Sequence, residues 1–237
     1  MKLFLKKKIN NLKLRWAKTS SKRYVNFLRS KGVVIGDKID FHGGIKSMSF
    51  DITRPSLVTI GSNISFNKNF TLLTHDWGGY VLRNKYKEFI SSSGPVEIGN
   101  NVVFGQNITI LKGVTIGDNC IIGLNSVITK DIPSNSVAVG APAKVVSTLE
   151  GYYEKRKKQS INEALVYAKS IEERFNRLPK IEELWEEFPL FLRGNELIDN
   201  LPIKRQLGDA YEFYKENNQP VFKGFNDFLE QAGVNIK

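Results

Sequence analysis

The stretch VEIGNNVVFGQNITILKGVTIGDNCIIGLNSVITKDIP, residues 96–133, repeats its apolar residues every six positions. The large apolar members of the repeat are Ile98, Phe104, Ile110, Ile116, Ile122 and Ile128. Four positions after a member comes a small or β-branched residue, in the series Val102, Ile108, Val114, Cys120 and Ser126. A helix repeats its buried face about every 3.6 residues and a strand every 2, so a period of six fits neither. This period is typical of a solenoid in which short strands stack around an apolar interior.

The same repeat begins earlier in the chain. The segment VTIGSNISFNKNFTLL, residues 58–73, places Ile60, Phe66 and Leu72 at the same spacing, and VVIGDKI, residues 33–39, is an isolated unit. Each short strand pairs with the equivalent strand of the next coil, so we expect parallel sheets. Glycine and asparagine at the corners are expected to supply the left-handed φ values that tight turns need. The pattern therefore predicts a mainly β fold, a parallel β-helix over residues 32–149.

The N-terminal segment, residues 1–31, carries eleven Lys or Arg residues and no Asp or Glu. Leu5, Ile9, Leu12 and Trp16 are spaced to share one face of a helix. We predict a basic amphipathic helix that either lies on an anionic membrane surface or docks its apolar stripe on the following domain. Residues 150–237 are helical in composition and are interrupted by prolines, so we expect a helical C-terminal appendage that caps the solenoid.

The net charge of +11 comes entirely from residues 1–31, because acidic and basic residues balance in the rest of the chain. That distribution argues against a nucleic-acid partner. The single cysteine, Cys120, excludes an intrachain disulfide and indicates a reducing compartment; its inward place in the repeat predicts inert packing. No apolar run approaches the roughly 20 residues of a membrane span. We expect a cytoplasmic protein, attached peripherally at the inner face of the membrane if residues 1–31 bind lipid.

Three segments resemble the hexapeptide-repeat acyltransferases, and within them the galactoside/maltose O-acetyltransferases and the acetyltransferases of surface-polysaccharide gene clusters. These segments are VTIGSNISFNKNFTLLTHDW (58–77), PVEIGNNVVFGQNITILKGVTIGDN (95–119) and SVITKDIPSNSVAVGAPAKVV (126–146). The resemblance covers about residues 57–148. It implies a left-handed β-helix, a hand that the period alone does not give, since right-handed crossovers are the general rule.

His75 is one of only two histidines, and it stands where the repeat breaks for about 25 residues between Leu72 and Ile98. In the family a loop at this place, here residues 74–95, carries the catalytic histidine. The resemblance therefore makes His75 the general base, a role that suits a neutral imidazole at cytoplasmic pH. Asp76 is either an orienting partner for His75 or a solvated carboxylate. His42 lies in a less regular coil and is expected to be structural or exposed.

Trp77 and Tyr80 offer flat faces on which a sugar ring could stack, and Arg83 could meet an anionic sugar or a phosphate. The alternative is that the loop aromatics pack on a neighbouring subunit. By resemblance, acetyl-CoA lies in a groove between subunits of a homotrimer. The residues that match its binding wall are Gly105, Gly123, Ser126, Thr129, Lys130 and Lys144. The chain departs from the family at Leu124 and Asn125, where Ala-Gly is common.

The sequence thus predicts an acetyl-CoA-dependent O-acetyltransferase that acts on a sugar hydroxyl of a surface polysaccharide (capsule or lipopolysaccharide O-antigen) or its precursor. A xenobiotic O-acetyltransferase, a sugar-amine N-acetyltransferase and a non-catalytic β-helix scaffold remain alternatives. Serine acetyltransferase is disfavoured because its long N-terminal helical domain is missing. A zinc enzyme of the γ-carbonic-anhydrase type needs three histidine ligands, and the chain has two histidines, so no metal is expected.

Overall fold

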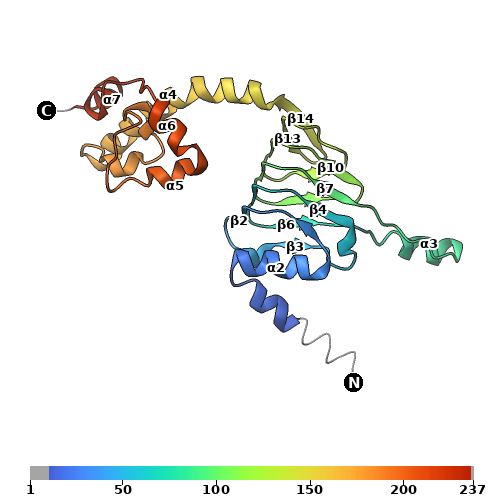
Figure 1. The fold of residues 1–237 in the computed structure, drawn as a ribbon. Coiled ribbons are helices and arrows are strands. Elements are labelled where there is room, and N and C mark those ends of the chain that lie inside the picture. Colours follow the sequence, from blue (N-terminus) through green and yellow to red (C-terminus); the bar gives the residue numbers. More distant parts are fainter. Residues whose placement is uncertain (1–10, 236–237) are drawn as a thin grey trace. The chain divides into compact units, whose positions relative to one another are not determined.

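The computed structural model describes residues 11–235 and contains the predicted parallel β-helix. Its strands form three sheets, ordered β1-β4-β7-β10, β14-β13-β11-β8-β5-β2 and β12-β9-β6-β3. The three sheets therefore form the three faces of a prism, and successive coils stack along its axis (Figure 1). Every pairing is parallel except that of β13 with β14, which is antiparallel.

The strands are two to six residues long. Their bounds are β1 Val34–Ile35, β2 Ile39–Phe41, β3 Ser49–Phe50, β4 Val58–Ile60, β5 Ile64–Phe66, β6 Phe70–Leu72, β7 Val96–Ile98, β8 Val102–Phe104, β9 Ile108–Ile110, β10 Val114–Ile116, β11 Cys120–Ile122, β12 Val127–Ile128, β13 Ser136–Gly140 and β14 Ala143–Thr148. Short 3-10 turns precede β3 and β4, η1 at Ile45–Ser47 and η2 at Pro55–Leu57.

The six-residue period is one third of a coil. Ile98 pairs with Ile116 and Phe104 pairs with Ile122, so equivalent residues 18 positions apart stack on one another. In β8 the first and third side chains are buried and the middle one is exposed, the alternation expected of a strand with one wet face. Phe66 and Phe104 stack with ring centroids 5.4 Å apart in the core, and Phe70 meets Phe104 edge-on at 5.1 Å.

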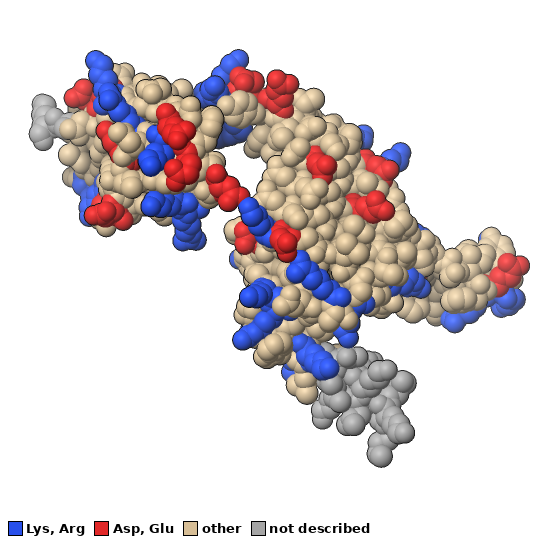
Figure 2. All heavy atoms as spheres, in the orientation of Figure 1, with Lys and Arg blue, Asp and Glu red and all other residues tan. Residues whose placement is uncertain are grey.

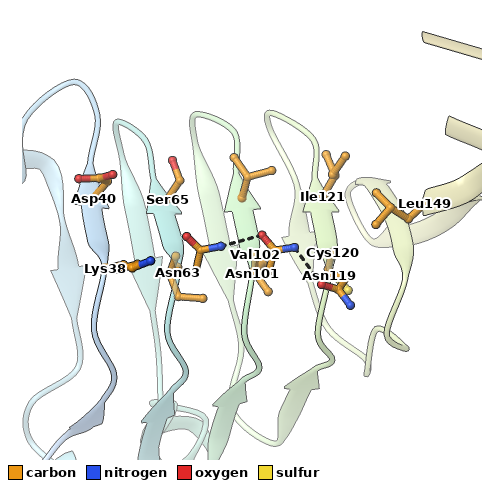
Figure 3. Close-up of a pocket in the computed structure, with 12 residues that line it drawn as sticks. Lys38, Asp40, Asn63, Ser65, Asn101, Val102, Asn119, Cys120, Ile121 and Leu149 are labelled. Carbon is orange, nitrogen blue, oxygen red and sulfur yellow. Dashed lines mark hydrogen bonds between the residues drawn. The ribbon is translucent and has the colours of Figure 1, made fainter. Parts of the chain in front are cut away.

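Asparagines form the left-handed corners as predicted. Asn63, Asn101 and Asn119 all have φ near +60°, and their side-chain amides bond in a ladder from coil to coil, drawn as dashed lines in Figure 3. The corresponding prediction for glycine is confirmed at Gly113, whose φ is +76°, and is wrong for Gly105 and Gly123, which do not have positive φ. A Cβ on Gly105 would lie 2.6 Å from a backbone nitrogen of the next coil, so close stacking requires glycine there.

The N-terminal region contains two helical stretches. Residues 11–17 are helical, and after a turn α2 (Ser21–Lys31) begins with the Ser20 side chain accepting a bond from the Arg23 amide. Ala17, Tyr24 and Leu28 are buried in the same core as the first coils, so α2 covers that end of the β-helix (Figure 1).

The predicted apolar stripe of this region does not dock on the β-helix where the structure describes it. Leu12 is 59% exposed and Trp16 is 62% exposed. Leu5 and Ile9 lie outside the described residues. The docking alternative is therefore wrong for Leu12 and Trp16, and Ala17, Tyr24 and Leu28 bury the face instead.

After β14 the chain becomes helical, and it divides between Tyr152 and Tyr153 into two compact units. The helices of this part are α4 Leu149–Phe175, α5 Ile203–Leu207, α6 Tyr211–Asn217 and α7 Phe225–Gln231, with 3-10 turns η3 Ile181–Leu184, η4 Phe188–Leu190 and η5 Gly208–Ala210. The second unit has a hydrophobic core of its own that includes Ala168, Phe188 and Phe228. Among residues 11–235, no helix has the length and apolarity of a transmembrane span.

Candidate active site

The break in the repeat is an excursion that leaves the β-helix after β6 and returns at β7. It contains α3 (Gly79–Tyr86) and projects from the coils (Figure 1). Its root is closed by an antiparallel bridge between His75 and Ser93 and by the Gly94 amide, which donates to the Thr74 carbonyl at 3.0 Å. His75 is therefore held at the edge of the rigid coils, and it is half-buried.

The imidazole of His75 is oriented by Asp51, a residue of the coil below. Asp51 Oδ2 lies 2.5 Å from His75 Nδ1 and also accepts from the Thr74 hydroxyl at 2.5 Å. Asp51 Oδ1 accepts from the Thr53 hydroxyl at 2.6 Å and from the Thr53 amide at 3.0 Å. Since a carboxylate only accepts, Nδ1 carries the donated proton, and Nε2 is the nitrogen left to take up a proton.

Asp51 is ionised in this setting. Its side chain is only 4% exposed. Burial opposes ionisation, but the hydrogen bonds from Thr53, Thr74 and His75 outweigh burial and hold the pKa of this carboxyl well below its usual range. A buried carboxylate against Nδ1 favours the imidazolium that forms when Nε2 accepts a proton.

A cavity of about 280 Å³ opens beside His75 at the foot of the excursion. Its lining is Thr53, Arg54, His75, Asp76, Trp77, Gly79, Tyr80, Phe89, Ile90, Ser91 and Ser92. The Trp77 ring centroid is 6.4 Å from that of His75. The structure thus brings predicted residues Trp77 and Tyr80 to one cavity with His75. Arg83 does not line it, and its guanidinium lies over the Tyr80 ring at 5.2 Å.

Asp76 does not orient His75. Its carboxylate instead ties the excursion together, accepting from the Gly78 amide at 2.9 Å, from the Ser92 hydroxyl at 2.9 Å and from the ammonium of Lys112 on the coils. The hydrogen bond from Lys112, with those from Gly78 and Ser92, lowers the pKa of Asp76 to about 2. The orienting role considered for Asp76 therefore belongs to Asp51.

The residues expected to bind the cofactor do not line this cavity within one chain. Thr129, Lys130 and Lys144 are exposed. Ser126 is fully buried, where its hydroxyl donates to the Gly123 carbonyl at 2.6 Å and accepts from the Gly140 amide at 3.1 Å. A residue so enclosed is poorly placed for a cofactor contact.

The glycines on that list, and the departure from the family beside them, have structural explanations. A Cβ on Gly123 would lie 2.3 Å from a side-chain atom of Val139, so a larger residue there would have to displace the Val139 side chain. Leu124 is 65% exposed. Asn125 has a φ of +58° and accepts from the Asn107 amide at 2.7 Å, as a member of a second asparagine ladder.

The remaining candidate residues lie apart from the cavity. His42 is exposed in the turn after β2. Cys120 is buried as predicted, and burial raises the pKa of its thiol. Among residues 11–235, no group of three or more His, Cys, Asp and Glu side chains is arranged to hold a metal ion.

Sequence reasoning missed Asp51, Thr53, Thr74 and Arg54. The signal for Asp51 is its register: it follows β3 directly, Phe50 pairs with Leu72, and the Asp51 amide donates to the Leu72 carbonyl at 2.9 Å. The first coil is longer than 18 residues, so the regular spacing does not lead to this pairing.

A second hollow, of about 300 Å³, lies along the sheet of β2, β5, β8 and β11 (Figure 3). Asn63, Asn101 and Asn119 line it, and their amides bond to one another. It also contains Lys38 and Asp40 but no histidine and no buried carboxylate. The hollow beside His75 is therefore the better candidate for catalysis.

Comparisons with known proteins agree with the repeat. A family model described as bacterial transferase hexapeptide (six repeats) matches residues 95–130. The chain is 37% identical over 158 residues to protein CapG of Staphylococcus aureus, covering 63% of this chain and 90% of CapG. It is 43% identical over 89 residues to the galactoside O-acetyltransferase of Escherichia coli strain K12, covering 38% of this chain and less than half, 43%, of that enzyme.

Among solved structures, a maltose O-acetyltransferase from Clostridium difficile 630 has 29% sequence identity and a TM-score of 0.44, and the match covers 58% of this chain and 83% of that one. The alignment with CapG extends well beyond the repeats of residues 95–130.

Proposed function

This chain belongs to the bacterial hexapeptide-repeat transferase family, and from that premise we infer that it transfers an acetyl group from acetyl-CoA to a sugar hydroxyl. The acceptor we propose is a surface polysaccharide, a capsule or an O-antigen, or its precursor. The left-handed winding of the family is part of this proposal. The observation that carries it is the Asp51–His75 pair at the edge of a cavity with aromatic walls.

His75 is the general base in this mechanism. Its Nε2 takes the proton of the acceptor hydroxyl while the oxygen attacks the acetyl carbonyl carbon. When the tetrahedral intermediate collapses, the carbon–sulfur bond breaks, and the proton passes from His75 to the departing thiolate. Such catalysis contributes typically ~10²–10⁴-fold. No acyl-enzyme is required, and Cys120, at 1% exposure, is closed off from substrates.

Sugar binding is supported by the shape and chemistry of the cavity. Trp77 is 80% exposed and Tyr80 is 59% exposed, and both line the hollow beside His75. Flat aromatic faces next to a base are suited to a ring that presents C–H groups on one side and hydroxyls at its edge. The galactoside O-acetyltransferase, a relative over 89 residues, supports an acceptor of this class.

A homotrimer with the site at subunit interfaces completes the proposal. The excursion exposes Trp77, Val81, Phe89 and Ile90, more apolar surface than a projecting loop normally leaves in water. The predicted cofactor residues do not line the cavity beside His75 of the same chain. A neighbouring copy would cover the exposed apolar residues of the excursion, and it would bring its own cofactor-binding residues to His75. Lys130 and Lys144 would then meet the phosphates of coenzyme A.

The test of the mechanism is His75→Ala, with His42→Ala as the matched control because His42 is exposed and does not line the cavity. We expect His75→Ala to lower turnover by ~10²–10⁴-fold. Acetyl-CoA should still raise the melting temperature of the variant, since ligand binding stabilises the folded state. An active His75→Ala enzyme would remove the mechanism. No stabilisation of the wild-type protein by acetyl-CoA would favour the non-catalytic scaffold.

Peripheral membrane binding is proposed for the N-terminal helices. Figure 2 shows Lys and Arg side chains gathered over this region, and Leu12 and Trp16 are exposed beside them. Basic groups near an anionic leaflet contribute about 1 kcal/mol each. The double variant Leu12→Glu/Trp16→Glu tests this better than a deletion, because removing residues 1–31 would also remove buried Tyr24 and Leu28. If the double variant sediments with phosphatidylglycerol vesicles to the same extent as the wild-type protein, membrane binding through this region is refuted.

A further inference from the structure

Two carboxylates lie close to His75, Asp76 in the lining of the cavity and Asp51 bonded to the imidazole Nδ1, and the charges of both are engaged. Asp51 is bonded to Thr53, Thr74 and His75. Asp76 is paired with Lys112. Besides His75 and Asp76, the charged side chain of the lining is Arg54.

The carboxylate that orients His75 also holds the residue that precedes Arg54. Asp51 accepts from both the amide and the hydroxyl of the preceding residue, Thr53. On the other side, the Arg54 carbonyl accepts from the Leu57 amide at 3.0 Å at the start of η2. The backbone of Arg54 is thus held between two anchors, one of which also determines where the imidazole points.

Most N–H donors of the Arg54 guanidinium are available to a ligand. Its contact within the chain is with the Thr53 hydroxyl at 3.5 Å, a long distance for a hydrogen bond. No carboxylate forms an ion pair with it among the residues that the structure describes. Guanidinium carries five N–H donors in a planar fork that matches two oxygens of a carboxylate or a phosphate.

We propose that Arg54 is a specificity residue that binds an anionic group, a carboxylate or a phosphate, on the acceptor sugar. This rests on the proposed acetyl transfer and names its acceptor class: an acidic sugar. The aromatic faces of Trp77 and Tyr80 hold the ring, Arg54 holds its negative group, and the hydroxyl that is acetylated is the one that then meets His75.

Coenzyme A does not account for Arg54. Its phosphates are separated from the thioester by the whole length of the pantetheine arm. A cation in the same cavity as the imidazole therefore faces the reacting end and the acceptor. The remaining alternative is that Arg54 stabilises the oxyanion of the tetrahedral intermediate, which would make it equally important for neutral and acidic acceptors.

Three acceptors of the same shape separate these roles: 4-nitrophenyl β-glucoside, 4-nitrophenyl β-glucuronide and 4-nitrophenyl β-glucoside 6-phosphate. They differ only at C6, which is the carbon of a neutral hydroxymethyl group, of a carboxylate or of a phosphorylated hydroxymethyl group. With acetyl-CoA, we expect kcat/KM for one of the two anionic glycosides to exceed that of the neutral one by at least about tenfold, the effect of one charge-assisted contact. The preferred anion identifies the group.

Arg54→Gln should remove this preference, mainly by raising KM, whereas Arg54→Lys should keep part of it. Lys85→Ala is the matched control, since it removes a cation from the same excursion at a residue outside the cavity lining. A wild-type enzyme that prefers the neutral glycoside, or an Arg54→Gln variant that loses kcat equally on all three, would overturn the proposal and leave acetyl transfer standing.

If no glycoside is acetylated, saturation-transfer NMR with the acetyl-CoA-bound protein decides. Tighter binding of an anionic glycoside that Arg54→Gln abolishes supports the specificity role, although the proposed transfer to sugars would then have failed. Equal binding of the three glycosides refutes the specificity role.

Discussion

The carboxylate of Asp51 accepts hydrogen bonds from residues of two neighbouring coils: Thr53 next to it, and Thr74 and His75 on the coil above. A histidine on a projecting loop would otherwise sample several ring orientations. Here one buried, ionised group selects the orientation and the tautomer. Asp51 acts through His75 and is therefore a positioning residue.

Replacing Asp51 by Asn preserves its size but removes the charge and one acceptor oxygen. We expect kcat to fall by roughly 10²-fold or more, because an asparagine in the equivalent place of a serine-protease triad costs about 10⁴-fold. KM for acetyl-CoA should change little, since Asp51 is buried beneath the imidazole. Steady-state kinetics measure both.

Asp37→Asn is the control for this experiment, because Asp37 is a surface carboxylate paired with Arg29. A rise in KM with kcat unchanged would mean that Asp51 shapes the binding site rather than orienting the base.

The root of the excursion, residues 74–95, is held by backbone bonds and by a surface cluster of polar groups around Asp76. Asp76 joins the excursion to Lys112 of the coils. Its pKa is lowered to about 2 in the folded protein, against about 3.9 for a free aspartate. The cluster therefore stabilises the closed root fully above pH ~4 and loses that contribution as pH falls toward 2.

Hydrogen exchange should report this loss. The Gly94 amide, which donates to Thr74, should be protected at pH 6 and lose protection between pH ~4 and 2 after correction for intrinsic exchange. In the Asp76→Asn variant the Gly94 amide should be unprotected already at pH 6, while the Gly105 amide in the coils stays protected. Equal protection of Gly94 at both pH values would mean that other contacts hold the root.

The asparagine ladder is the element that sets the corners of the coils. Asn101 has a φ of +55°, accepts from Asn63 at 3.0 Å and donates to Asn119 at 2.8 Å. Asn101→Ala should lower the free energy of unfolding by about 1–3 kcal/mol, through backbone strain and two lost hydrogen bonds.

Asn101→Gly should cost less than Asn101→Ala, because glycine relieves the strain but not the loss of the bonds. Urea unfolding measures both variants, with Asn26→Ala on the exposed face of α2 as the control. An equal cost for Ala and Gly would show that the amide bonds alone determine the corner.

At the scale of the whole molecule, the two units have separate cores. One contains Leu28, Phe66 and Phe104, and the other contains Phe188 and Phe228. A chain ending at Tyr152 should therefore remain folded, keep its cooperative melting transition and still be stabilised by acetyl-CoA. Loss of soluble protein on this truncation would show that the helical unit is needed to protect the β-helix.

Light scattering should give three times the chain mass of 26.9 kDa for the active species, and the truncated chain should also be trimeric. An active monomer would contradict a site shared between copies.

The sequence by itself determined that the chain forms stacked coils, and that the histidine stands where the repeat breaks. A period of six is a local property of the sequence, and the same spacing recurs from Ile98 to Ile128. The break after Leu72 marks the excursion for the same reason. Only the tertiary structure brought Asp51 beneath His75 and Arg54 beside it, because the first coil departs from the regular spacing. Contacts between coils depend on which residues pair. In a coil of irregular length the sequence spacing does not give that pairing, and only the folded structure does.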